Sequence, residues 1–337
     1  MNRPRVLIIS PAEAGANNGN WQTAWRWSRL LRHAFKPTIA QRWDGAPFDV
    51  MLALHARRSA DTITRWAQTH GSRSEAPGLG VVLTGTDLYR DIHSDASAQA
   101  SLVLAKRLVL LQACGPNALP HALRPKARVI FQSVSSRPSH TKTQRHLRVV
   151  MVGHLRDEKS PQTLFATARL LQGEPNILID HIGAALDPEL GAQALACADE
   201  CPNYRWLGGL SHEVTRRHIQ RAHLLVHTSR MEGGAHVLME AVCSGTPVLA
   251  SRIDGNVGML GQDYTGYFTH GDAAALVNLL RHCRDAQMQH AATLTIHQPP
   301  KVDFFNQLQA QCTQRAPLFA PATEQAALIA LVRELLP

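Results

Sequence analysis

The stretch SRMEGGAHVLMEAVCSGTPVLAS, residues 229–251, holds two glutamates eight positions apart on either side of a Gly-Gly pair. Gly233 and Gly234 let the backbone approach a ligand closely. The apolar run after them predicts a helix, whose first turn directs unpaired N–H groups and the positive end of its dipole at the same place. A diphosphate suits that place. Glu232 and Glu240 only accept hydrogen bonds, so they are fitted to bind the hydroxyl groups of a sugar and a ribose.

The residues around this stretch predict its place in a fold. Gly245 ends the helix and Pro247 opens an apolar strand. Short apolar runs alternate with helical segments such as 21–33 and 60–70, a pattern typical of a parallel sheet with helices on both faces. We expect strands at 6–10, 38–41, 50–54, 80–83, 108–112, 129–132, 149–152, 177–182, 204–207, 224–228, 248–251 and 267–268.

A chain of 337 residues is long enough for two domains. The polar stretch 133–146 has no apolar period and predicts a linker. We therefore expect an α/β fold with two doubly wound, Rossmann-like domains, 1–146 including the linker and 147–320. The last helix, in 321–337, is expected to pack back on the first domain. Ligands of two such sheets bind at the carboxyl ends of the strands, so we expect them in a cleft between the domains.

The composition, 45% hydrophobic and 18% charged, is that of an ordinary globular protein. The apolar run 102–111 is interrupted by Lys106 and Arg107 and falls short of the roughly 20 residues that span a bilayer. The run 6–9 is too short for a signal peptide, so we expect a cytoplasmic protein without stable membrane insertion. Six scattered cysteines are typical of buried thiols in a reducing compartment, and we expect no bound metal.

The net charge of +9 is unevenly distributed, because residues 1–146 carry +12 and the remainder carries −3. A basic first half fits a small anionic acceptor, an anionic membrane surface or nucleic acid. The basic residues come singly or in pairs, which argues against nucleic acid. Trp21, Trp25 and Trp27 with nearby arginines would suit a membrane surface. Trp21 and Trp25, however, share much of one helical face with leucines, which favours a core position.

The E-x7-E spacing followed by A-x3-G-x-P-V, residues 232–248, resembles the nucleotide-sugar motif of family 4 glycosyltransferases. Members are retaining enzymes built from two facing Rossmann-like domains, the GT-B fold. The resemblance implies that Glu232 acts at the transferred sugar. It also implies that the loop and the helix after it bind the nucleotide sugar through Gly233, Gly234, Ala235, His236, Val237 and Glu240.

The sequence VGHLRDEK, residues 152–159, resembles the G-R-L-x3-K element of the same family. In that element an arginine and a lysine neutralise the leaving diphosphate. Lys159 matches the lysine. His154 stands where the family usually has arginine, and Arg156 is placed to supply the missing charge. In the first half, Gly19 and Asn20 close a Gly- and Asn-rich loop, 11–20, that we expect to approach the nucleotide sugar.

Two further strand ends carry polar residues. LTGTD, residues 83–87, resembles the family position that meets the reacting sugar, although family members often carry histidine there. LHARRS, residues 54–59, places a histidine and two arginines at a helix start, a combination that suits an anionic acceptor. We therefore expect acceptor-binding residues at Thr84, Thr86, Asp87, His55, Arg57 and Arg58.

Within the family, the motifs at 19–27, 53–60, 83–91, 152–159, 181–188 and 229–237 resemble the selenosugar synthases of selenoneine biosynthesis, over about residues 5–285. The resemblance implies transfer of N-acetylglucosamine or glucose from a UDP-sugar to selenophosphate, with small-molecule substrates and no tightly bound cofactor. A conventional glycosyltransferase acting on a saccharide or lipid is the alternative. A sugar-nucleotide-binding protein without catalysis is a third.

Overall fold

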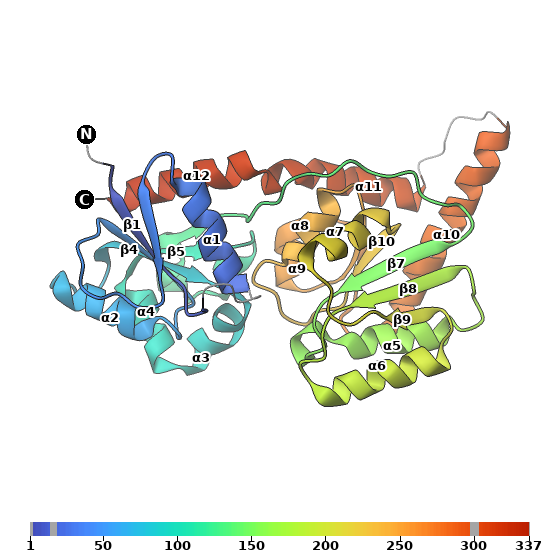
Figure 1. The fold of residues 1–337 in the computed structure, drawn as a ribbon, viewed down its shortest axis with the longest axis horizontal. Helices are drawn as coiled ribbons and strands as arrows, with labels where there is room; N and C mark the ends of the chain where they lie inside the picture. Colours follow the sequence, from blue (N-terminus) through green and yellow to red (C-terminus); the bar gives the residue numbers. More distant parts are fainter. Residues whose placement is uncertain (1–2, 14–18, 297–302, 337) are drawn as a thin grey trace. The chain divides into compact units, whose positions relative to one another are not determined.

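The computed structural model describes residues 3–13, 19–296 and 303–336 (Figure 1). The chain forms two compact units, which we call unit 1, Met1–Ser133 with Leu318–Pro337, and unit 2, Val134–Pro317. The polar stretch expected to close the first domain thus groups with unit 2 from residue 134 onward. It packs there through hydrogen bonds from the Arg137 N–H to the Cys243 carbonyl, 2.8 Å, and from Gln220 Nε2 to the Pro138 carbonyl, 2.6 Å.

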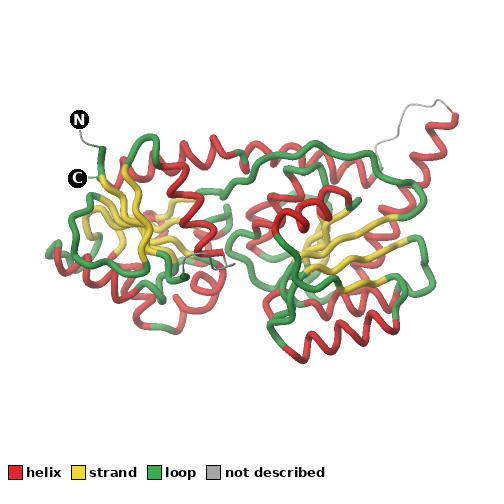
Figure 2. The backbone as a smooth tube through the Cα atoms, in the orientation of Figure 1, coloured by secondary structure: helices red, strands yellow, loops and turns green. Residues whose placement is uncertain are grey.

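Unit 1 is built on one six-stranded parallel sheet in the order β2-β1-β3-β4-β5-β6. Figure 2 shows the strands in yellow and the helices in red. Its strands are β1 (Arg5–Ile9), β2 (Lys36–Ala40), β3 (Val50–Leu54), β4 (Ala76–Leu83), β5 (Ala105–Leu110) and β6 (Ala127–Val129). Its helices are α1 (Gly19–Leu31), α2 (Ala60–Thr69), the π-helical turn η1 (Asp87–Asp91), α3 (Ile92–Ser94), α4 (Ala96–Leu104) and α12 (Pro321–Leu335), with short 3₁₀ turns at Gly115–Ala118 and His121–Lys126.

Unit 2 has a second six-stranded parallel sheet, ordered β12-β11-β10-β7-β8-β9. Its strands are β7 (Leu147–Val152), β8 (Ile177–Ile182), β9 (Tyr204–Trp206), β10 (Leu224–His227), β11 (Val248–Ser251) and β12 (Tyr267–Phe268). Its helices are α5 (Pro161–Leu170), α6 (Pro188–Glu200), α7 (His212–Arg221), α8 (His236–Val242), α9 (Asp254–Leu260), α10 (Ala273–Ile296) and α11 (Phe304–Arg315), with a 3₁₀ turn at Asp157–Lys159. A further 3₁₀ turn, Ala316–Phe319, begins in unit 2 and ends in unit 1.

The expectation of two parallel-sheet, Rossmann-like domains is confirmed. The central strands are apolar along their whole length because helices cover both faces of each sheet. Every residue of β3, for example, is buried, and alternate residues join the cores on opposite faces. A strand buried at every position has an apolar sequence, and this is the pattern from which strands such as β3 were predicted.

The tryptophans of α1 differ from the expectation. Trp27, not Trp25, is the core residue: Trp27 is fully buried, whereas Trp25 is 46% exposed and stacks against the Arg29 guanidinium at 4.7 Å. The buried positions are Thr23, Ala24, Trp27 and Leu31, so the inner face of the helix is rotated from the predicted one.

Helix α12 packs on unit 1, where its buried leucines join the core that holds Trp27 and Leu31. A carboxylate in its first turn fixes the contact. Glu324 is 1% exposed and accepts hydrogen bonds from Trp27 Nε1 at 2.7 Å, Arg26 Nε at 3.0 Å and the Ser133 backbone N–H at 2.9 Å. A buried carboxylate needs such donors to replace its lost hydration.

In the parts of the chain that the structure describes, none of the helices combines the length and the apolar character that crossing a membrane requires.

Candidate active site

Lys159 and Glu232 meet at the carboxyl ends of two neighbouring strands of unit 2. Lys159 closes the 3₁₀ turn after β7, Glu232 lies in the loop after β10, and these two strands pair directly. Lys159 Nζ donates to Glu232 Oε1 at 2.5 Å, and both side chains are largely buried. Two residues 73 positions apart, each predicted to act at the site, therefore form one ion pair.

Glu232 has a second partner that sequence reasoning missed. His227, the last residue of β10, is fully buried and donates from Nε2 to Glu232 Oε1 at 3.1 Å. Burial by itself would raise the pKa of Glu232, but the charge of Lys159 and the hydrogen bonds from His227 and Lys159 outweigh it and hold that pKa well below its usual range. Glu232 is thus a fixed negative charge. The only feature of the sequence that could have indicated a role for His227 is its position, since it is a polar residue at the end of an apolar strand.

His154 lies in the loop between β7 and the 3₁₀ turn. Its Nδ1 accepts from the Ala184 N–H at 3.1 Å, across two loops that touch closely: a Cβ on Gly183 would lie 1.9 Å from the Gly153 carbonyl oxygen. Burial and the nearby charges of Arg156 and Lys159 lower the pKa of His154. A neutral ring whose Nδ1 accepts carries its proton on Nε2. His154 therefore offers a neutral N–H donor where an arginine would offer a cation.

Arg156 is exposed, and its Nε lies 3.9 Å from Glu158 Oε2. Arg156 lies in the same loop, two residues after His154. Its distance to a carboxylate oxygen is longer than the 2.5 Å between Lys159 Nζ and Glu232 Oε1. The loop thus supplies one fixed cation, one neutral donor and one exposed cation.

The Gly-Gly loop leads into α8 as expected, but α8 has only seven residues. The chain continues from Glu232 into the first turn of this helix through Gly233, Gly234, Ala235, His236 and Val237. Glu240 lies in the next turn. Gly245 ends the segment with a positive φ of 67°, the conformation for which glycine is preferred.

Glu240 is 4% exposed and lies at the centre of three side chains. His212 Nε2 is 2.5 Å from Glu240 Oε1, His236 Nε2 is 3.7 Å from it and Arg216 Nε is 4.0 Å from it. The Glu240 hydrogen bond raises the pKa of His212. His212 and Arg216 come from α7 and had no sequence signal, because their positions became adjacent to α8 only in the folded unit.

In unit 1 the predicted acceptor residues cluster at the carboxyl ends of β3 and β4. Asp87 is fully buried: its Oδ1 accepts from the Thr84 N–H at 2.6 Å and its Oδ2 from the Ala56 N–H at 2.9 Å. Burial raises the pKa of Asp87 to about 6, although these hydrogen bonds oppose the rise. Asp87 was predicted to bind the acceptor, and in the structure its two oxygens accept hydrogen bonds from the two loops that it joins.

His55 also differs from a ligand-facing residue. It is 2% exposed, has a φ of 70°, and lies with Nδ1 3.8 Å from Asp87 Oδ2. Burial and the charge of Arg58 lower the pKa of His55 to about 4. Arg57 and Arg58 are exposed, and Arg57 Nε pairs with Asp91 Oδ2 at 2.9 Å. Asp87 and His55 thus position the loops from which the two arginines project.

Three further predicted site residues, Thr86, Gly19 and Asn20, belong to the described part of the chain. Thr86 is half-buried and precedes the π-helical turn η1, and Gly19 and Asn20 begin α1. Residues 14–18 of the loop expected to approach the nucleotide sugar lie outside the described residues.

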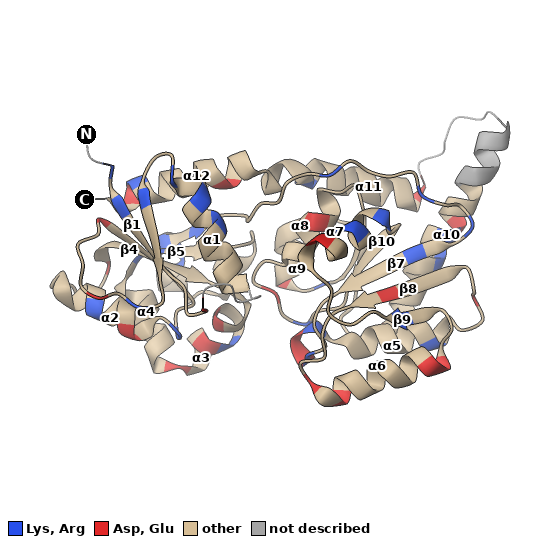
Figure 3. Ribbon diagram, in the orientation of Figure 1, with Lys and Arg blue, Asp and Glu red and all other residues tan. Residues whose placement is uncertain are grey.

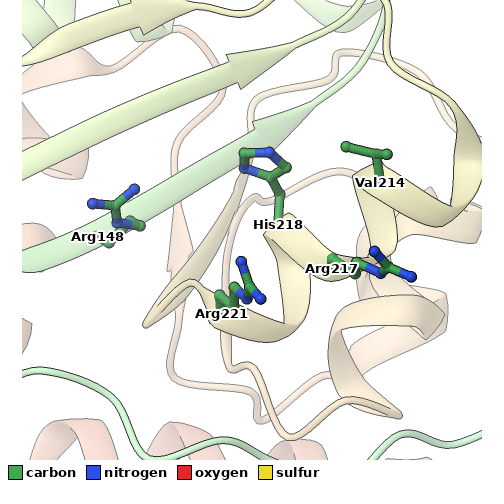
Figure 4. Close-up of a pocket in the computed structure, with 5 residues that line it drawn as sticks. All are labelled: Arg148, Val214, Arg217, His218 and Arg221. Carbon is green, nitrogen blue, oxygen red and sulfur yellow. The ribbon is translucent and has the colours of Figure 1, made fainter.

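A basic hollow lies elsewhere on unit 2 (Figure 4). It is lined by Arg148 at the start of β7 and by one face of α7, residues Val214, Arg217, His218 and Arg221. Both signs of charge occur along α7 (Figure 3), and Arg217 pairs with Glu213 at 3.0 Å. Because ligands of parallel sheets bind at the carboxyl ends of strands, a hollow at the amino end of β7 is not the expected substrate site.

The geometry agrees with a family relationship. Residues 134–291, which include both the Lys159 and the Glu232 loops, match the family described as Glycosyl transferases group 1. The matched region lies within unit 2. A curated relative, glycosyltransferase 1 domain-containing protein 1 of Xenopus tropicalis, is 25% identical over 211 residues, 56% of this chain. The chain spans 61% of that relative's length.

Solved structures share the fold along the whole chain. Sucrose-phosphate synthase from Thermosynechococcus elongatus superimposes with a TM-score of 0.75 at 14% identity, covering 99% of each chain. HepE of Anabaena, in complex with UDP and glucose, superimposes with a TM-score of 0.68 at 14% identity, covering 98% of this chain and 100% of HepE. The region that matches this family therefore lies within a chain that has the GT-B fold.

Proposed function

We propose that this protein transfers a hexose, N-acetylglucosamine or glucose, from a UDP-sugar to selenophosphate. The products are a 1-selenosugar, UDP and phosphate. The observation that carries the donor half is the Lys159–Glu232 pair, 2.5 Å apart, at the carboxyl ends of β7 and β10 in a domain that matches a glycosyltransferase family. The acceptor half depends on the resemblance of the sequence to selenosugar synthases.

On the donor side, each charge has a proposed task. Lys159, with the His154 N–H and the exposed Arg156, neutralises the diphosphate as the bond from C1 to its oxygen breaks. Glu232, held ionised by its partners, accepts from sugar hydroxyls, and Glu240 accepts from the ribose. Gly19, Asn20 and the 233–237 loop supply further contacts. A uridine nucleotide is proposed because HepE, which shares the fold, was crystallised with UDP-glucose.

On the acceptor side, the exposed Arg57 and Arg58 are proposed to hold the anion, with Thr84 and Thr86 at their side. Selenophosphate is already anionic at neutral pH, so its selenium can attack C1 without a general base. The new C–Se bond replaces the C–O bond to UDP. Water then cleaves the P–Se bond, which releases phosphate.

A UDP-release screen tests the proposal. UDP-glucose and UDP-N-acetylglucosamine are each incubated with selenophosphate, thiophosphate, phosphate, simple saccharides and lipid acceptors. We expect release with selenophosphate, weaker release with thiophosphate, and none with phosphate. Release with saccharides or lipids but not with selenophosphate would leave a conventional glycosyltransferase, and UDP-sugar binding without release would leave a binding protein.

The acceptor side has its own variants. Arg58→Ala should raise the selenophosphate concentration needed for half-maximal release about tenfold or more while UDP binding stays unchanged, since a hydrogen bond to a charged group contributes about 1.5–3 kcal/mol. Arg73→Ala removes the same charge from another exposed position of unit 1 and serves as the control. Equal effects of the two changes would mean that only the general charge of the unit matters.

A further inference from the structure

Three potential metal ligands converge on one face of unit 2. His212, His236 and Glu240 each offer one ligand atom, and these atoms lie within 4.8 Å of one another. Among the described residues no other group of three histidine, cysteine or acidic side chains meets this condition. We propose that these three residues form a binding site for a divalent transition-metal ion of the Zn²⁺ type, a site that the metal and the ribose of the nucleotide cannot occupy together.

The spacing of the ligand atoms fits such an ion. Zn²⁺ binds histidine nitrogen and carboxylate oxygen at about 2.0–2.2 Å, which places two ligand atoms of a tetrahedral site about 3.3 Å apart. The Nε2 atoms of His212 and His236 lie 2.5 Å and 3.7 Å from Glu240 Oε1, on either side of that value. Small rotations of two side chains would bring all three atoms to bonding distance.

The three proposed ligands come from two helices and differ in how far their side chains are exposed to solvent. His236 and Glu240 are one helical turn apart on α8, so their side chains share a face, and His212 reaches the same oxygen from the first position of α7. Glu240 is buried, whereas the side chains of His212 and His236 are 70% and 38% exposed. An ion can therefore arrive from solvent, meet a fixed carboxylate and keep water as its fourth ligand.

Arg216 restricts which ion fits. Its Nε lies 4.0 Å from Glu240, while its other nitrogens donate to the Ser135 carbonyl at 2.8 Å and hydroxyl at 3.3 Å. The guanidinium repels a cation bound at Glu240. A hard ion such as Mg²⁺, which would depend on the carboxylate alone, therefore gains too little binding free energy from the carboxylate to offset this repulsion. Imidazole nitrogens favour Zn²⁺, Co²⁺ or Cu²⁺ instead.

The exclusion of ribose rests on the proposed function, because it takes Glu240 as the ribose ligand. A metal ion held by His212, His236 and Glu240 would fill the space beside Glu240 Oε1 and draw on the charge of the carboxylate, so a ribose hydroxyl could not approach that oxygen. Transition-metal ions would then inhibit nucleotide binding, and the nucleotide would protect the site from metal.

Calorimetric titration of the full chain with Co²⁺ tests the metal site. We expect one site that His212→Ala and His236→Ala each weaken about 100-fold or more, since even the loss of an outer-shell partner costs 10–100-fold. His218→Ala, on the same helix but outside the group, should leave the site intact and controls for the other histidines. Equal Co²⁺ binding by wild type and His212→Ala would overturn the proposal and leave an ordinary ion pair with Glu240.

Repeating the titration with uridine, which has the ribose but no phosphate to chelate the metal, separates the two hypotheses. Uridine at ten times its own Kd should weaken Co²⁺ binding about elevenfold if the two compete. Co²⁺ binding that needs His212 but ignores bound uridine would support the metal site and contradict Glu240 as the ribose ligand.

Discussion

At the residue scale, Lys159 has two effects that can be separated. In the proposed reaction it stabilises the departing diphosphate, and in the folded protein it balances the buried charge of Glu232. Removing one partner of a buried ion pair leaves an uncompensated charge, whereas removing both charges does not.

We predict that Lys159→Ala lowers kcat/KM for UDP release about 10- to 150-fold, equivalent to about 1.5–3 kcal/mol, and also lowers the free energy of unfolding by about 3 kcal/mol. Adding Glu232→Gln should restore most of the stability but none of the activity. Urea unfolding and UDP-release kinetics measure the two quantities. A Lys159→Ala protein with normal activity would remove this lysine from the site.

The two glutamates of the 229–251 stretch should also act separately. Glu240→Ala should weaken the binding of UDP, because the proposal places this carboxylate on the ribose. Glu232→Gln should leave UDP binding nearly unchanged and weaken only the UDP-sugar. Calorimetric titration with UDP and with UDP-glucose compares them, and unchanged UDP affinity in Glu240→Ala would contradict the ribose assignment.

At the scale of elements, Asp87 joins the end of β3 to the turn after β4. Its two oxygens accept from different backbone N–H groups, so Asp87→Asn must turn an amide NH₂ toward one of these donors. We expect a loss of about 1–3 kcal/mol in the stability of unit 1, the cost of an unsatisfied buried donor. Asp95→Asn is the control, because Asp95 caps α4 by accepting from the Ala98 N–H at 2.9 Å and asparagine caps equally well.

Helix α12 offers a second matched pair of changes. Glu324→Gln should cost about 2–4 kcal/mol, since the buried oxygens accept from Arg26, Trp27 and Ser133 and an amide cannot accept from all of them. Glu334→Gln should cost less than about 1 kcal/mol, because this residue is 31% exposed to water where it pairs with Arg107. Hydrogen exchange in α12 measures both, and similar exchange rates in the two variants would contradict the role assigned to Glu324.

At the scale of the whole molecule, the sequence was most informative where burial is continuous. All twelve strands were expected within a few residues. The signal was clearest for buried central strands such as β3, because a parallel strand covered on both faces is an apolar run. Pairings such as Glu240 with His212, or Glu324 with Trp27, link distant segments and depend on packing that has no local pattern. The inner face of α1 was misassigned for a related reason, since several aromatic residues could have formed the core and only tertiary contacts select Trp27.

The buried histidines give the two units different sensitivities to acid. Burial lowers the pKa of His181 and His223 in unit 2, and of His55 in unit 1, to about 4 in each case. Unfolded histidines bind protons near pH 6.5, so these rings favour unfolding as the pH falls from about 6.5 to 4. In unit 1 the raised pKa of Asp87, about 6, has the opposite effect, because the folded state then binds its proton first.

We therefore predict that unit 2 is the acid-labile unit. Between pH 6.5 and 4, His181 and His223 should each remove up to about 1.4 kcal/mol of the stability of unit 2 per pH unit, while His55 and Asp87 largely cancel in unit 1. Hydrogen exchange at pH 7 and pH 5, corrected for intrinsic rates, reports each unit through its own peptides. His223→Asn should reduce the pH dependence of unit 2, since one of its buried neutral rings is gone, whereas His93→Asn, at an exposed position of unit 1, should change neither unit. A larger loss in unit 1 than in unit 2 would mean that the buried rings are not what makes the fold sensitive to acid.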